Sequence, residues 1–262
     1  MPTPVLHAET RGAGPRLVLA HGFTQSGRVW GGLADDLATD HQVVLVDLPG
    51  HGRSADCRVG LVQGAGLLGE TGGSADYLGY SMGARFCLHL ALARPDLVRR
   101  LVLVSGTAGI DDPGERAERR RADEASAERL DPSTGRTAPD TVAGFVDRWV
   151  ANPLFGDVPA AANGLDERNR NSAAGLASSL RLAGTGTQEP LWDRLGGLSM
   201  AVLVLTGSRD AKFTALGRRM VEAIGPNARQ VEIAGADHAP QLQRPGAVAT
   251  AVRTFLAGPD QL

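Results

Sequence analysis

The chain is poor in lysine and cysteine and has no long apolar run. Its formal net charge is −2, which argues against a nucleic-acid or membrane-surface partner. Lys212 is the only lysine, so nearly all of the basic residues are arginines. The number of arginines therefore does not indicate a binding site, and only their positions can. The two cysteines, Cys57 and Cys87, give neither a disulfide framework nor the spacing of a metal site.

The apolar runs are also too short for a membrane protein. None of them approaches the ~18–20 residues that a membrane span needs. The first residues lack the basic and then apolar pattern of a signal segment. We therefore expect a cytoplasmic protein without membrane insertion, and we expect neither a metal nor a cofactor. The oligomeric state is not indicated by the sequence.

Short apolar runs alternate with amphipathic segments along most of the 262 residues, of which 42% are hydrophobic. The runs predict buried strands and the segments predict helices. The expected strands are 5–9, 17–20, 43–46, 76–78, 101–104, 201–205 and 230–233, and the expected helices are 30–38, 61–68, 85–93, 215–224 and 245–256. This alternation predicts an α/β fold with a mostly parallel sheet covered by helices on both faces.

Between residues 111 and 190 the apolar strand runs disappear, and charged, alanine-rich helical patterns replace them. Residues 131–140, rich in Pro, Ser, Thr and Gly, are expected to form a loop there. We predict a helical cap over 111–190, inserted into a core made of 1–110 and 191–262. Caps of this kind shape substrate pockets and exclude water.

Residues 79–85 read Gly-Tyr-Ser-Met-Gly-Ala-Arg, between an apolar approach and a helical run. This matches a G-x-S-x-G nucleophile elbow, in which a strained turn presents the serine at the end of a strand. Gly79 and Gly83 provide the room that such a turn needs. The alternative is a serine in an ordinary glycine-rich turn between a strand and a helix.

The rest of a catalytic triad follows in the order that this scaffold uses, serine, acid and then histidine. Asp210 comes after the strand predicted at 201–205, and His238 after the one at 230–233. The backbone N–H groups of Phe23 and Met82 are the expected oxyanion donors. Alternatively, Asp210 is a turn former and His238 a surface residue. The three residues follow one another in the expected order, and each comes after a predicted strand, which favours the triad Ser81, Asp210 and His238.

Several separate motifs give the chain a resemblance to a known family. They are 21–23 (HGF), 46–52 (VDLPGHG), 79–85 (GYSMGAR), 115–123 (ERAERRRAD), 168–171 (RNRN), 207–213 (GSRDAKF) and His238. Over nearly its whole length the chain resembles the 2-succinyl-6-hydroxy-2,4-cyclohexadiene-1-carboxylate synthases, menaquinone-pathway lyases with the α/β-hydrolase fold. The first two motifs and the histidine are shared with many hydrolases, whereas Arg85, the arginine-rich run and Asp-Ala-Lys-Phe are more specific.

The resemblance implies a small anionic polycarboxylate substrate that carries an enolpyruvyl ether. It implies elimination of pyruvate, opened by removal of a ring proton. It places the triad on Ser81, Asp210 and His238, the oxyanion donors on Phe23 and Met82, the carboxylate-binding arginines on Arg85, Arg119 and Arg168, and pocket-lining roles on Tyr80 and Trp149.

The chemistry of Arg85 supports an anionic ligand independently of the resemblance. It falls in the first turn of the predicted helix after Ser81, where the helix end is positive. Arginine binds carboxylates in bidentate fashion. The alternatives are a buried ion pair for Arg85 and a solvated helix face for Arg119 and Arg168.

Two other functions remain open. The first is a serine hydrolase of a small ester or a carbon–carbon bond, in which Ser81 attacks a carbonyl. The second is a non-enzymatic ligand-binding protein, such as a receptor, which has less need of an aligned acid. Pyruvate release compared with ester cleavage distinguishes the three.

Overall fold

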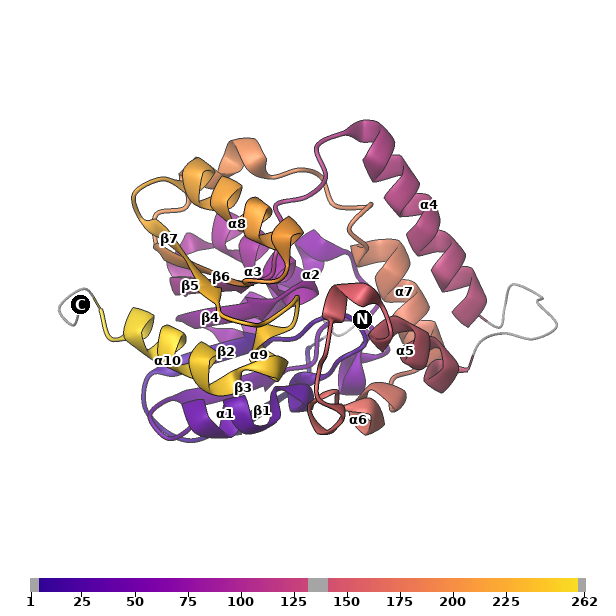
Figure 1. Cartoon of the computed structure of the whole chain (residues 1–262), viewed down its shortest axis with the longest axis horizontal. Coiled ribbons are helices and arrows are strands. Elements are labelled where there is room, and N and C mark those ends of the chain that lie inside the picture. The colour runs from indigo at the N-terminus through magenta and orange to yellow at the C-terminus, as the bar shows by residue number, and fades with distance from the viewer. Residues whose placement is uncertain (1–4, 132–140, 259–262) are drawn as a thin grey trace.

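The computed structural model describes residues 5–131 and 141–258, in which a seven-stranded sheet lies between two layers of helices (Figure 1). The strand order is β1-β3-β2-β4-β5-β6-β7; β1 is antiparallel to β3, and the other neighbours are parallel. The strands are β1 Ala8–Arg11, β2 Arg16–Ala20, β3 Gln42–Val46, β4 Ala75–Tyr80, β5 Val98–Val104, β6 Ala201–Gly207 and β7 Ala228–Ile233. This arrangement confirms the predicted fold class.

Helices cover both faces of the sheet. The core α-helices are α1 Gly31–Leu37, α2 Leu61–Gly72, α3 Met82–Ala93, α8 Ala211–Ile224, α9 Pro240–Gln243 and α10 Pro245–Leu256. Short 3-10 helices are η1 Gly27–Trp30, η2 Gly52–Ser54, η3 Pro95–Leu97, η5 Pro153–Phe155, η6 Ala160–Ala162 and η7 Trp192–Gly197. One apolar cluster packs α2, α3 and α8 on one face, and a second packs α1 and α10 on the other.

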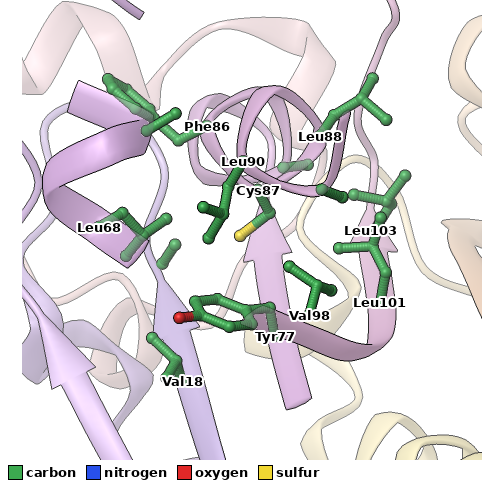
Figure 2. Close-up of a cluster of buried hydrophobic side chains, with 14 of the residues drawn as sticks. Val18, Leu68, Tyr77, Phe86, Cys87, Leu88, Leu90, Val98, Leu101 and Leu103 are labelled. Atoms are coloured by element: carbon green, nitrogen blue, oxygen red, sulfur yellow. The ribbon is translucent and has the colours of Figure 1, made fainter. Parts of the chain in front are cut away.

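The strands read as continuous apolar runs because both of their faces are buried. In β2, Leu17 and Leu19 point into the cluster below α1 and α10, whereas Val18 and Ala20 point into the opposite cluster. Figure 2 shows the cluster that contains Val18 and lies against α2 and α3, where Tyr77 lies below helix α3. Burying each large side chain contributes about 1.5–3 kcal/mol, so this core holds the sheet edge that carries the site.

The chain between β5 and β6 forms helices that lie together at the right of Figure 1. They are α4 Pro113–Leu130, α5 Val142–Val150, α6 Leu165–Asn169 and α7 Ala173–Ala183. Among the described residues of this insertion there is no strand. Most of the loop expected at 131–140 lies outside the described residues. The insertion has its own apolar cluster, which includes Phe145, Leu176 and Leu180 and is contacted by Phe23 of the core.

The first strand differs from the expected one. It was predicted over 5–9, but it forms at Ala8–Arg11, where it pairs with Val46 to Val43 of β3. Val5 is 79% exposed, so its apolar side chain does not mark a buried strand. An edge strand takes its register from its single neighbour, a constraint that local pattern does not contain.

Two sequence expectations concern the cysteines and the membrane. Cys57 and Cys87 are both buried and free. Over residues 5–131 and 141–258, none of the helices combines the length and the apolar character that crossing a membrane requires.

Candidate active site

Ser81 lies in the sharp turn between β4 and α3, with φ 51° and ψ −104°. This backbone conformation is strained for a residue with a side chain. A Cβ on Gly79 would lie 2.5 Å from the carbonyl oxygen of Gly83, and one on Gly83 would overlap the carbonyl of Ala20. Only glycine fits at both positions, so the sequence spacing has a steric cause.

Three side chains from separate strand ends form a hydrogen-bonded chain. Nδ1–H of His238 donates to Oδ2 of Asp210 over 2.9 Å, and Oγ–H of Ser81 donates to Nε2 over 3.2 Å. Asp210 and His238 are both buried. The second oxygen of Asp210 accepts the N–H of Phe213, so the carboxylate also caps helix α8. Such a chain can move a proton from the serine hydroxyl to the imidazole.

Phe23 and Met82, the two expected oxyanion donors, line the same cavity as Ser81. Met82 is the first residue of α3, so its N–H has no acceptor within the helix. The N–H of Phe23 makes no hydrogen bond with any residue that the structure describes. The loop before it is fixed by Gly22, whose N–H donates to Oε1 of Gln25 over 2.9 Å. The positions of Phe23 and Met82 suit a pair of oxyanion donors.

A cavity of about 590 Å³ opens above Ser81 and extends below the inserted helices. Its wall contains Phe23, Met82 and Trp149 together with both signs of charge. The wall cations are Arg85, Arg119, Lys212 and Arg219, and the wall anions are Asp111, Asp112, Glu115 and Asp123. Arg219 pairs with Asp111 over 2.5 Å, which neutralises that corner of the cavity.

Arg85 occupies the cavity wall next to the serine and is only 6% exposed. Its Nη1 donates to the carbonyl of Ala183, the last residue of α7, over 2.8 Å. Burial, with a smaller effect of Arg119, lowers the pKa of this guanidinium to about 10. No carboxylate within the described residues lies at ion-pair distance, so the sequence alternative of a buried ion pair is wrong.

The other two predicted carboxylate-binding arginines, Arg119 and Arg168, border different spaces in the structure. Arg119 lines the cavity, and its Nε donates to Oδ1 of Asp123 over 2.8 Å. Arg168 is 2% exposed and lies outside this cavity, beside a separate space of about 10 Å³ next to Tyr80. The structure therefore brings Arg85 and Arg119 together and leaves Arg168 apart.

The comparisons with known proteins agree with this geometry. A family model described as "Alpha/beta hydrolase family" matches residues 17–251. The chain belongs to the alpha/beta hydrolase family. A 2-succinyl-6-hydroxy-2,4-cyclohexadiene-1-carboxylate synthase of Escherichia coli O1:K1 / APEC is 32% identical over 248 residues, covering 88% of this chain and 95% of the relative. The resemblance stated from the motifs is confirmed.

A second group of relatives carries a different name. A pimeloyl-[acyl-carrier protein] methyl ester esterase of Xanthomonas campestris pv. campestris (strain B100) is 31% identical over 261 residues, 96% of this chain and 99% of that one.

The structure of MenH from S. aureus superposes with a TM-score of 0.85 at 27% identity, over 96% of this chain and 98% of that chain. These alpha/beta hydrolase relatives support an enzyme, and their names include both a synthase and an esterase.

The structure adds site residues of this alpha/beta hydrolase family member that sequence reasoning did not assign. The ring of Phe213 lies 4.2 Å from that of His238, and Phe155 lies 5.8 Å away on the same imidazole. Lys212 lines the cavity mouth. The motif at 207–213 contained Lys212 and Phe213, but a motif does not show which of its side chains turns toward the histidine.

Tyr80 and Trp149, the two predicted pocket-lining residues, lie in different places, because Tyr80 is not part of the wall of the large cavity. Trp149 lines the large cavity, and its ring lies 4.9 Å from that of Phe23. Tyr80 is buried below the loop of Phe23, and burial raises the pKa of its phenol far above the usual value. Both side chains also border the small space beside Arg168.

Proposed function

We propose that this chain is a lyase of menaquinone biosynthesis. Its reaction eliminates pyruvate from 2-succinyl-5-enolpyruvyl-6-hydroxy-3-cyclohexene-1-carboxylate to give 2-succinyl-6-hydroxy-2,4-cyclohexadiene-1-carboxylate. The observation that carries the proposal is Arg85, a buried guanidinium in the cavity wall that has no carboxylate partner among the described residues. A substrate with several carboxylates supplies the missing negative charge, whereas a neutral ester does not.

The names of substrate and product fix the bonds that change. Carbon 2 of the ring loses a proton next to the succinyl carbonyl, and the C–O bond at carbon 5 breaks. The electron pair of the C–H bond moves through the ring double bond, and the departing enolpyruvate keeps the C–O pair. Enolpyruvate then takes up a proton on carbon and becomes pyruvate, so no water is consumed.

The triad has a defined part in this scheme. His238 accepts the hydroxyl proton of Ser81, and the resulting alkoxide removes the ring proton. Asp210 holds the imidazole in the tautomer that can accept at Nε2. The N–H groups of Phe23 and Met82 stabilise the negative charge that develops on the succinyl carbonyl oxygen. No acyl-enzyme forms in this reaction.

Positive charge in the cavity holds the substrate. Arg85 and Arg119 bind its carboxylates, and Lys212 at the mouth attracts the anion. Arg119 already donates a hydrogen bond to Asp123. Its contribution to substrate binding therefore depends on exchanging that contact for one with a substrate carboxylate. Trp149 provides an apolar wall for the ring.

The test is to follow pyruvate release from the enolpyruvyl cyclohexene substrate beside a panel of p-nitrophenyl esters. The proposal expects turnover of the first substrate, abolished by Ser81→Ala, and slow or absent ester cleavage. Efficient ester cleavage without pyruvate release would overturn it.

An ester hydrolase is the second candidate. It is supported by the Xanthomonas relative and by the same hydrogen-bonded Ser81, His238 and Asp210. In that reaction Ser81 attacks the ester carbonyl and water releases the acyl group. An acyl adduct on Ser81, trapped and weighed by mass spectrometry with a slow ester, distinguishes it from the lyase.

A further inference from the structure

Thr24, next to the proposed oxyanion donor Phe23, has an unusual backbone conformation. It is fully buried and has φ 66°, a region that β-branched residues rarely adopt. Holding a non-glycine residue there costs on the order of 1–3 kcal/mol, and it persists only where the surroundings enforce it. The position of the Phe23 N–H therefore depends on what holds Thr24.

Every polar group of Thr24 has a partner from another part of the chain. Its N–H donates to Nε2 of His51 over 3.2 Å, and its carbonyl accepts Nδ2–H of Asn171 over 2.7 Å. Its hydroxyl accepts a hydrogen bond from Nη1 of Arg168. His51 belongs to the core, whereas Arg168 and Asn171 belong to the inserted segment.

His51 can accept this bond because its other ring nitrogen is a donor. Nδ1–H donates to the carbonyl of Pro49 over 3.0 Å, which fixes the tautomer. Burial, and then the neighbouring His21, lower the pKa of His51 to about 3, so the ring stays neutral. At neutral pH, Nε2 of His51 is therefore always able to accept the hydrogen bond from the N–H of Thr24.

Arg168 has little room for a substrate carboxylate. Its Nε donates to the carbonyl of Asn163 over 2.7 Å, and its Nη1 donates to the hydroxyl of Thr24 and, over 3.5 Å, to the carbonyl of Phe23. The space beside it measures about 10 Å³, which holds at most one water molecule. Asn171 is equally occupied, because its Oδ1 accepts the N–H of Gly52 over 2.8 Å.

We propose that Arg168 and Asn171 are positioning residues through which the inserted helices fix the backbone of Phe23 and Thr24. The oxyanion site is then complete only when the segment around α6 lies against the core. The catalytic consequence rests on the proposed function, whereas the effect on the loop does not. This assigns Arg168 a role other than the direct carboxylate binding that the resemblance implied.

The first experiment measures both consequences in Asn171→Ala and Arg168→Ala. Hydrogen–deuterium exchange of the peptide spanning 21–27 should become at least about tenfold faster, because the opened loop exposes the Thr24 amide. The kcat for pyruvate release should fall about 10- to 100-fold, with KM within about twofold. Arg170→Ala is the matched control, since Arg170 is exposed and pairs with Glu167 on the same short helix.

The second experiment is a double-mutant cycle with Thr24→Gly. Glycine adopts φ 66° without strain and removes the hydroxyl that Arg168 contacts. In that background Arg168→Ala should lower kcat clearly less than it does in the wild type, because only the 3.5 Å contact of Nη1 with the carbonyl of Phe23 remains to be lost. A full effect of Arg168→Ala in the Thr24→Gly protein, or a rise confined to KM, would overturn the proposal.

The two experiments separate this inference from the proposed function. Unchanged exchange of 21–27 in both variants would overturn the positioning role whatever the reaction is. If the wild type releases no pyruvate, the proposed function fails, and p-nitrophenyl acetate cleavage replaces pyruvate release because it uses the same oxyanion donors. Faster loop exchange with unchanged cleavage would then contradict the inference.

Discussion

Asp210 divides its carboxylate between His238 and a helix. One oxygen accepts Nδ1–H of His238 over 2.9 Å, and the other caps α8 through the N–H of Phe213 over 3.1 Å. The side chain of Asp210 therefore has the contacts that each of its two sequence interpretations, a turn former and a triad acid, requires. The start of α8 fixes the direction in which the acid faces the imidazole.

Asp210→Asn should lower kcat on the order of 10³- to 10⁴-fold with a smaller change in KM. Asparagine caps a helix as well as aspartate does, so Oδ1 stays on α8 and the amide turns its N–H groups toward His238. The imidazole then takes the other tautomer and cannot accept from Ser81. Steady-state kinetics check this, with Asp237→Asn as the control, because Asp237 bonds Gln243 and not the ring. Equal losses in both variants would contradict it.

Ser81→Ala should reduce pyruvate release on the order of 10³- to 10⁶-fold, because triad members act as a unit. The cavity and its arginines stay in place, so binding of the substrate should persist. Calorimetric titration of the variant with substrate measures that binding, and a pyruvate assay measures turnover. Near wild-type turnover would show that the serine takes no part in the reaction.

Arg85→Lys should lower kcat/KM for the anionic substrate roughly 10- to 100-fold. A hydrogen bond to a charged group contributes about 1.5–3 kcal/mol, and lysine loses the bidentate fork. Arg94→Lys is the matched control, because Arg94 is exposed beyond the other end of α3 and pairs with Asp96 over 2.7 Å. An unchanged kcat/KM for Arg85→Lys would favour the ester hydrolase.

The protein should lose stability as the pH falls below about 6.5. Burial lowers the pKa of His21 and of His89 to about 4 and that of His51 to about 3, whereas all three titrate near 6.5 in the unfolded chain. The unfolded state therefore binds protons first, so the stability present above pH 6.5 declines toward pH 4 and 3. Each histidine contributes a slope of about 1.4 kcal/mol per pH unit in that window.

Urea unfolding at several pH values between 7.5 and 5 measures this slope. His51→Asn should reduce the slope of the free energy of unfolding against pH by the contribution of one histidine, about 1.4 kcal/mol per pH unit. A free energy of unfolding that stays constant from pH 7.5 to 5 would show that none of these three buried histidines resists protonation.

The sequence predicted the parts of the site that local patterns encode. Strands buried on both faces give continuous apolar runs, and the crowding at Gly79 and Gly83 requires the elbow pattern. The helix predicted over 85–93 begins at Met82, because the turn at Ser81 passes directly into α3. Steric and hydrophobic demands of this kind act over a few residues and so leave a readable signal.

Contacts between distant segments left no such signal. Arg168 and Thr24 lie 144 positions apart, and neither residue type marks its partner. The left-handed conformation of Thr24 contradicts its own preference and arises only from the tertiary surroundings. Similarity to a family could name Arg168, but the direction of its side chain depends on how the inserted segment packs.

The position of the inserted helices between the neighbouring strands β5 and β6 makes the molecule modular. The two ends of the insertion lie side by side, where the N–H of Leu191 donates to the carbonyl of Ala108 over 2.7 Å, and none of its described residues takes part in the β5–β6 ladder. Relatives named for a synthase and for an esterase match nearly the full chain. We therefore expect that exchange of residues 111–190 between such relatives would change the substrate that is bound and would leave the hydrogen-bonded Ser81, His238 and Asp210 in place.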